Sequence, residues 1–349
     1  MNLKQLHHKV MAGKTDYIPL MITIHREGGA WTSNWEATHN PQKYLDETLH
    51  RRTLEIDFPT DRAIVLESNF QETLVPSMYG AIPLEMPGGN IDVKPIINSI
   101  HEAEALEIDH APLEAAAQHV KYLKANAPSS VNVSITRFMA PLDYAVVMRG
   151  GDFYLDLCEE PEKSMAFLNK IADATLYAIK YLSAAVNHDY REYMTSNSRG
   201  IYIKGMRFSC DAWANLSPQM IEVVCIPLLR RLHDELGGVF THYCTTPFPA
   251  WHVLPTLAKH PGVVDGVDNW QGYRSFFDKD GNGLLQDKVS MCFDMPIDEV
   301  EDIDRLMQLP IFRDVKRDGG RGIFLATQTY DLERAKRLYD RWREYFDKK

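Results

Sequence analysis

Short apolar runs alternate with longer amphipathic segments along the whole chain. The runs are rich in Val, Ile, Leu and Phe and end at polar residues or glycine, a pattern typical of strands buried on both faces. The first run continues directly into His25, Arg26 and Glu27. The expected strands are residues 17–24, 63–66, 131–135, 200–204, 239–241, 263–267, 289–293 and 322–325.

The segments between these runs carry apolar residues at helical spacing. Pro161 stands in the first turn of one expected helix, and Ser217 and Pro218 begin another, in which Pro227 should produce a kink. Residues 77–90, with several glycines and prolines, predict an irregular excursion or a hairpin. The expected helices are residues 1–12, 41–53, 112–126, 141–149, 161–186, 218–236, 251–259, 297–308 and 331–346.

This alternation predicts an α/β protein in which residues 1–349 form a single (β/α)₈ TIM barrel. No glycine-rich nucleotide loop follows any expected strand, which argues against the open nucleotide-binding folds. In a barrel the carboxyl ends of all the strands meet on one face, and that face carries the functional site.

Composition narrows the class of partner. The chain has 45% hydrophobic residues and a formal net charge of −10, so nucleic acid and anionic membranes are not expected to bind it. Five scattered cysteines show no disulfide spacing, and neither a signal peptide nor a membrane-spanning run is seen. These features predict a cytoplasmic protein that acts on a small molecule.

The stretch 237–251 contains the strongest candidate for metal chemistry. His242 and Cys244 lie two residues apart where the expected strand ends, so both side chains should project to the same side. Imidazole and thiolate together suit Zn²⁺, whose catalytic sites need three protein ligands. Cys292 could supply the third ligand, with Asp294 or Asp268 in its place. The alternative is that His242 and Cys244 simply pack in the core.

Other polar residues at the expected strand ends should collect around the same pocket. We predict that some of them bind the substrate. The sequence does not indicate the oligomeric state. The substrate-binding candidates are Arg26, Asn69, Arg137, Asp268 and Trp270.

Several motifs resemble the uroporphyrinogen decarboxylase superfamily, in order over residues 140–345. They are Met148-Arg-Gly-Gly-Asp-Phe153 leading to Cys158-Glu-Glu-Pro161-Glu162, Asp211 followed by Leu216-Ser-Pro218 and Pro227, His242-Tyr-Cys244, and Val264-Asp-Gly-Val-Asp268. The resemblance implies a (β/α)₈ barrel.

One branch of that superfamily, the decarboxylases, has an arginine-rich loop near the N-terminus and a catalytic aspartate after the second strand. This chain has His25-Arg-Glu-Gly-Gly29 and Glu67-Ser-Asn69 at those places, and a single arginine beside a glutamate is a poor receptor for a substrate with many carboxylates.

The other branch contains zinc methyltransferases that work with corrinoid proteins, and its signature is His-x-Cys followed by a later Cys. His242 and Cys244 match, whereas Thr327-Gln328 stands where the later Cys usually occurs. The resemblance therefore implies a methyltransferase with Zn²⁺ at His242, Cys244 and Cys292, and with a corrinoid on a partner protein. Asp211 and His25 are the candidates for proton transfer. The alternatives are a metal-free uroporphyrinogen decarboxylase and a barrel that binds a tetrapyrrole or another small ligand without turnover.

Overall fold

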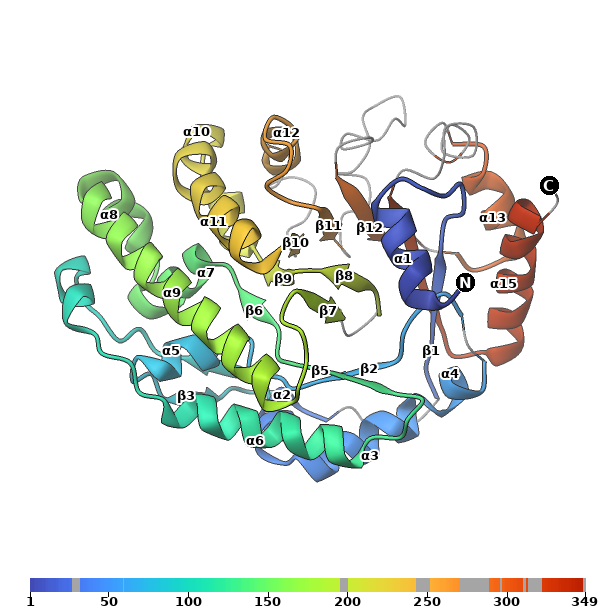
Figure 1. Cartoon of the computed structure of the whole chain (residues 1–349), viewed down its shortest axis with the longest axis horizontal. Helices are drawn as coiled ribbons and strands as arrows, with labels where there is room; N and C mark the ends of the chain where they lie inside the picture. Colours follow the sequence, from blue (N-terminus) through green and yellow to red (C-terminus); the bar gives the residue numbers. More distant parts are fainter. Residues whose placement is uncertain are drawn as a thin grey trace.

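Seven parallel strands form one hydrogen-bonded sheet in the computed structural model of the chain (Figure 1). The structure describes residues 1–26, 32–58, 60–194, 200–242, 252–269, 289–295, 297–309, 312 and 322–347. In spatial order the strands are β1 (Leu20–Ile24), β13 (Ile323–Thr329), β12 (Ser290–Asp294), β11 (Gly266–Asn269), β10 (Val239–His242), β9 (Met206–Ser209) and β6 (Phe138–Met139).

A second parallel pair, β2 (Val65–Glu67) and β5 (Asn132–Ser134), supplies the remaining wall. β5 runs on to β6 after three residues, so the two are parts of one barrel strand. On the other side, the Arg62 guanidinium before β2 donates to Thr23 Oγ1 of β1 at 2.8 Å. The pair thus lies between β1 and β6, and the strands form the TIM-barrel-like fold that the alternating pattern predicts. Whether the chain is one domain stays a prediction.

The prediction is wrong at one strand. Residues 200–204 were expected to form a barrel strand, but β8 (Tyr202–Lys204) pairs antiparallel with β7 (Glu192–Met194) in a hairpin, and β9 takes its place in the barrel. Gly205 separates β8 from β9 with a φ of 71°, and a Cβ there would stand 1.8 Å from the carbonyl oxygen of Gly238. This close approach requires glycine and turns the chain into the barrel.

Helices surround the strands (Figure 1). Their apolar faces pack inward; Ala335, Leu338 and Trp342 of the last helix are buried, and the Trp342 indole donates to the Ile18 carbonyl at 2.7 Å. The helices are α1 (Leu3–Met11), α2 (Asn34–His39), α3 (Pro41–Arg51), α4 (Thr53–Asp57), α5 (Leu74–Met78), α6 (Ala111–Asn126), α7 (Pro141–Arg149), α8 (Phe153–Glu159), α9 (Pro161–Ala185), α10 (Pro218–Met220), α11 (Ile226–Leu236), α12 (Val253–Ala258), α13 (Val300–Leu306) and α15 (Leu332–Asp347), with 3₁₀ turns at Ile100–Ala105 and Asp211–Asn215. None of the helices described is long and apolar enough to cross a membrane.

Turn and breaker residues mark two local features of the fold, of which the predicted hairpin is confirmed. The glycine- and proline-rich excursion contains a hairpin, in which β3 (Pro83–Glu85) pairs with β4 (Ile91–Val93). The helix that contains Pro227 is interrupted just before it by a π turn, Ile221–Cys225, whose last N–H bond runs from Ile226 to the Ile221 carbonyl. Proline has no N–H to donate, which accounts for the wider turn.

Helix α1 closes the end of the barrel where the strands begin. Asn2 and Gln5 form a capping box at its start. His7 on its buried face lies 2.8 Å from the Asp61 carbonyl through Nε2, and its Nδ1 accepts from the Tyr202 N–H at 3.0 Å. A neutral imidazole satisfies both bonds, and burial lowers the pKa of His7 to about 4. The opposite end, where the strands finish, is left for the functional site.

We expect Gly205→Ala to destabilise the protein by about 3 kcal/mol or more, because the new methyl group meets the Gly238 backbone in addition to the strained φ. Gly13→Ala is the matched control: its φ is 61°, but nothing lies within 4 Å of the added carbon. It should cost about 1 kcal/mol. Urea unfolding of both variants checks the difference, and equal losses would contradict the steric explanation.

Candidate functional site

Three candidate residues occupy aligned positions on neighbouring strands. The register pairs His242 of β10 with Asp268 of β11, and Asp268 with Cys292 of β12. Because aligned residues of parallel strands point to the same face, these side chains lie next to one another on the sheet. All three are buried. The predicted convergence of His242, Asp268 and Cys292 at the strand ends is therefore present in the backbone register.

Asp268 makes the central contact of this group. Its Oδ1 lies 2.6 Å from Nδ1 of His242. Arg207 of β9 approaches the same carboxylate from the other side, with Nη2 at 3.4 Å from both oxygens. Neither Arg207 nor Asp268 is appreciably exposed. One buried carboxylate thus fixes an imidazole and a guanidinium across three adjacent strands, and it directs His242 Nε2 away from itself.

A glycine beneath Asp268 makes room for this arrangement. Gly266 stands two residues earlier on β11, and a Cβ there would be 2.0 Å from the ring of Phe240. The Phe240 side chain fills the space that any other residue would take, and it is fully buried below His242 on the same strand. The polar side chains of Asp268 and His242 therefore lie next to an apolar layer formed by Phe240 and Gly266.

A second ionic group lies on the β2 and β5 side of the barrel. Glu67 ends β2, and its Oε2 is 3.2 Å from Nε of Arg137. Arg137 Nη2 donates to Asn69 Oδ1 at 2.9 Å, and Asn69 Nδ2 donates to Asn34 at 2.8 Å. Burial raises the pKa of Glu67 to about 8, although Arg137 and Arg207 both oppose the shift. Glu67 is therefore largely protonated at neutral pH.

His25 and Arg26 follow β1 but diverge. The His25 ring is buried, with Nε2 3.3 Å from Gln328 Oε1 of β13 and Tyr330 packed beside it. Burial lowers the pKa of His25, and nearby Arg52 adds to the effect. Arg26 is exposed and reaches toward α3, where its Nη1 lies 3.4 Å from His50. His25 thus belongs to the barrel end, whereas Arg26 contacts its outer rim.

Asp211 begins the 3₁₀ turn after β9, at the same end of the barrel as His242. The Cys210 N–H donates to the His242 carbonyl at 2.6 Å, which joins the two strand ends. Asp143 of α7 holds the turn, because its Oδ1 accepts from the Ala212 N–H at 2.9 Å. Complete burial raises the pKa of Asp143 well above its usual value.

Two predicted residues, Cys244 and Trp270, lie outside the described residues. Within the part of the chain that is described, no three His, Cys, Asp or Glu side chains are grouped closely enough to hold a metal ion. The metal assignment of His242, Cys244 and Cys292 and the roles of the other candidates therefore stay predictions.

Sequence reasoning missed Arg207 and Glu67 as site residues. Arg207 was hidden by the wrong strand at 200–204, since its inward position follows only when β9 begins at Met206. Glu67 directly follows an apolar run, so the strand-end rule that selected Asn69 could have found it.

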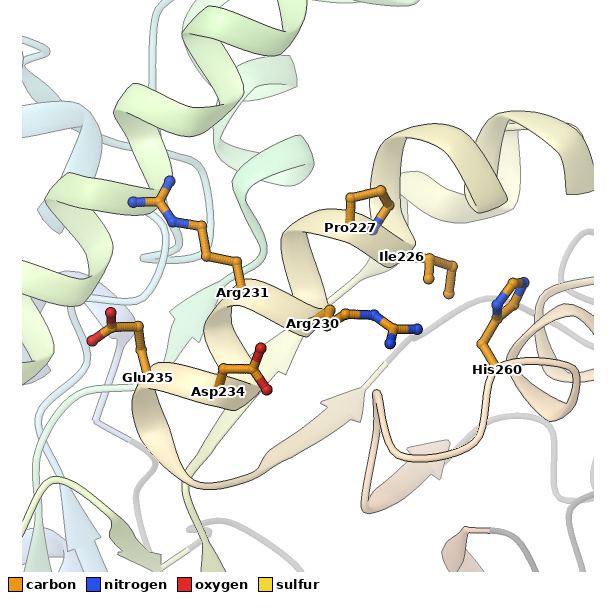
Figure 2. Close-up of a pocket in the computed structure, with 7 residues that line it drawn as sticks. All are labelled: Ile226, Pro227, Arg230, Arg231, Asp234, Glu235 and His260. Carbon is orange, nitrogen blue, oxygen red and sulfur yellow. The ribbon is translucent and has the colours of Figure 1, made fainter.

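An open groove of about 640 Å³ lies elsewhere, on the outer side of α11 (Figure 2). Arg230, Asp234 and His260 line it, together with residues at the start of the helix. Figure 2 shows Arg231 pointing away from His260. None of the candidate site residues lines this groove, so it is separate from the strand ends.

Comparison with known proteins supports the fold. No family model matches the chain, and a search of the curated proteins finds no relative. Among solved structures, a methyltransferase from Methanosarcina mazei superposes with a TM-score of 0.66 at 13% sequence identity, over 99% of this chain and 99% of that one. At this identity the likeness establishes the fold, and function has to be inferred from the site.

We predict that Asp268→Ala lowers the free energy of unfolding by about 3 kcal/mol or more, because it leaves the Arg207 guanidinium buried without its carboxylate. The control is Asp173→Ala, which removes an exposed carboxylate from Arg231. That change should cost about 1 kcal/mol or less. Denaturant unfolding at pH 7 compares them, and a smaller loss for Asp268→Ala than for Asp173→Ala would contradict the prediction.

Glu67 should make stability depend on pH. Its folded pKa is raised, so its contribution is full below the unfolded value near 4.5 and is lost as pH rises to about 8. The free energy of unfolding of the wild-type protein, minus that of Glu67→Gln, should therefore fall as pH rises across that window, by at most about 1.4 kcal/mol per pH unit.

Urea unfolding at pH 5, 6, 7 and 8 measures this difference. Glu160→Gln is the control, because Lys163 lowers the pKa of that exposed carboxyl, so its pH-dependent contribution lies below the unfolded value near 4.5 and its difference curve should be nearly flat from pH 5 to 8. A flat difference curve for Glu67→Gln would show that Glu67 is ionised in the folded protein throughout.

Proposed function

We propose that the protein is a zinc-dependent methyltransferase that passes a methyl group to or from a corrinoid held by a separate protein. The observation that carries the proposal is the contact between Asp268 and His242 at the end of β10. Histidines that bind metal commonly hold a carboxylate through the other ring nitrogen, which fixes their orientation. The fold shared with a methyltransferase supports the same class of reaction.

The types of side chain at this strand end, imidazole and thiolate, are ones that bind zinc. Metal would bind His242 at Nε2, since Asp268 holds Nδ1. Cys244 follows two residues later in the sequence, and Cys292 stands on the same face of the sheet as His242. We propose these as the three ligands, with Asp294 as the alternative to Cys292. Zinc bound in this way would act as a Lewis acid toward a thiol or toward the heteroatom of the methyl donor.

The other residues would handle substrate and protons. Burial lowers the pKa of His25 and so favours the neutral imidazole, which is the form that would accept a proton. Asp211 would act as the second proton-transfer residue from the end of β9. Asn69, Arg137, Asp268 and Trp270 would orient the small-molecule substrate, and Arg26 would contact it from the rim.

Zinc retention tests the proposal. After incubation with zinc and removal of free metal, the wild-type protein should keep about one equivalent, and Cys244→Ser should keep less than about a tenth, because a neutral hydroxyl replaces a thiolate. Asp268→Asn should weaken binding about 10- to 100-fold through the loss of support for His242. Cys292→Ser should weaken binding if Cys292 is the third ligand.

Cys158→Ser, at an exposed cysteine of α8, is the matched control and should retain zinc fully. Elemental analysis of all variants gives the readout, together with methylation of free cob(I)alamin by O-, N- and S-methyl donors, followed by absorbance. Wild-type protein that retains less than about a tenth of an equivalent would end the proposal.

A further inference from the structure

We propose that Arg137 is an anion-recognition residue and that the substrate of this site carries a carboxylate. The inference deepens the proposed function and rests on it, in that the ligand is taken to be a methylated small molecule. It is drawn from the geometry of Arg137, which differs from that of Arg207 on β9.

Arg137 is held in place but its donors are little used. Among the described residues, Nη2 makes one hydrogen bond, to Asn69 at 2.9 Å. Nε lies 3.2 Å from Glu67 but is buried without an aligned hydrogen-bond acceptor. A guanidinium carries five N–H donors in a planar fork that matches a carboxylate, so most of this fork remains for a ligand.

Exposure separates Arg137 from Arg207. The Arg137 side chain is 23% exposed, whereas its neighbour Glu67 is 3% exposed and Arg207 is 8% exposed. Arg207 is directed at Asp268 and is enclosed by the sheet. Arg137 lies between β5 and β6, and its guanidinium contacts Glu67 and Asn69 at the end of β2, so a ligand bound at that strand end would meet it without displacing the Arg207–Asp268 pair.

The local charge also favours an anion. Among the described residues Glu67 forms the ion pair with Arg137, and burial raises its pKa to about 8, so at neutral pH it cancels little of the positive charge. Glu72 lies within electrostatic range of Arg137, and its pKa is raised as well, chiefly by desolvation. A substrate carboxylate that binds at this strand end therefore meets the Arg137 guanidinium, whose ion-pair partner Glu67 is mostly neutral.

The Asn69 contact fixes the direction of approach. Asn69 Oδ1 accepts from Arg137, and its amide nitrogen donates to Asn34 at 2.8 Å, which in turn donates to Asn90 at 3.1 Å. This chain of amides ties the guanidinium to α2 and to the turn after β3. A positioned arginine loses less conformational entropy on binding than a mobile one, and this favours selective recognition.

Matched ligand pairs test the inference without turnover. The probes are methoxyacetate against 2-methoxyethanol, N-methylglycine against N-methylethanolamine, and methylthioacetate against 2-methylthioethanol. Each pair keeps the methyl-bearing atom and exchanges a carboxylate for a hydroxymethyl group. By calorimetry, the wild-type protein should bind the carboxylate of at least one pair about tenfold or more tightly than its alcohol.

Arg137→Gln should abolish this preference and leave binding of the alcohol unchanged, and Arg137→Lys should keep part of it. Arg231→Gln is the control, because Arg231 is also held by an asparagine and a carboxylate, Asn169 and Asp173, but on the outside of the barrel. That variant should keep the preference. Circular dichroism and unchanged binding of the alcohol confirm that the Arg137 variants are folded.

The outcomes separate this inference from the proposed function. No carboxylate preference in any pair, a preference that survives in Arg137→Gln, or no binding of any probe would overturn the role of Arg137, whether or not the protein retains zinc. A preference that depends on Arg137 in a protein that does not retain zinc would leave the anion site standing and remove the methyltransferase.

Discussion

The shared carboxylate of Asp268 is the interaction on which the strand-end face of this barrel depends. A charged side chain in a protein interior is stable only when its hydrogen bonds and its charge are matched. Asp268 meets both needs with His242 from one neighbouring strand and Arg207 from the strand beyond it. Because side chains in a strand alternate, a shift of one residue between β10 and β11 would turn Asp268 away from the interior. The polar contact and the register therefore support each other.

Two buried carboxyl groups of the barrel, Asp268 and Glu67, have arginine neighbours that are placed differently. Arg207 faces both oxygens of Asp268. Arg137 approaches Glu67 through an Nε that is not aligned for a hydrogen bond, and burial raises the pKa of Glu67 to about 8. Residue types at strand ends are similar on both sides, yet one side holds a compensated ionic group and the other a nearly neutral acid beside a cation. This asymmetry divides the face into a side where Asp268 orients the His242 imidazole and a side where Arg137 would meet the proposed anion.

Most of the barrel could be predicted from the sequence, because short apolar runs such as 17–24 and 239–241, separated by segments of helical spacing, are typical of strands buried on both faces. The error at 200–204 has a physical cause: β8 and β9 are both short and apolar enough, and the choice between them is made by the approach of Gly205 to Gly238. The candidate site was predictable as a set of strand ends, including His242, Asp268 and Cys292. The contacts within it were not, since the bond from Asp268 to His242 follows from the register between strands, which no local pattern contains.

The support around His242 has a chemical consequence for the proposed reaction. Arg207 occupies the second side of Asp268, so the carboxylate cannot swing with the imidazole, and the ring plane of His242 is set by two neighbouring strands. A metal bound at Nε2 would then have its direction fixed before any substrate arrives, which is the condition under which a Lewis acid acts without reorganisation. His25 directly follows β1, and burial lowers its pKa, with nearby Arg52 adding to the effect. In the proposed reaction a neutral His25 would be the form able to take up a proton from the substrate, and β13, β12 and β11 separate β1 from β10, which carries the proposed metal ligand His242.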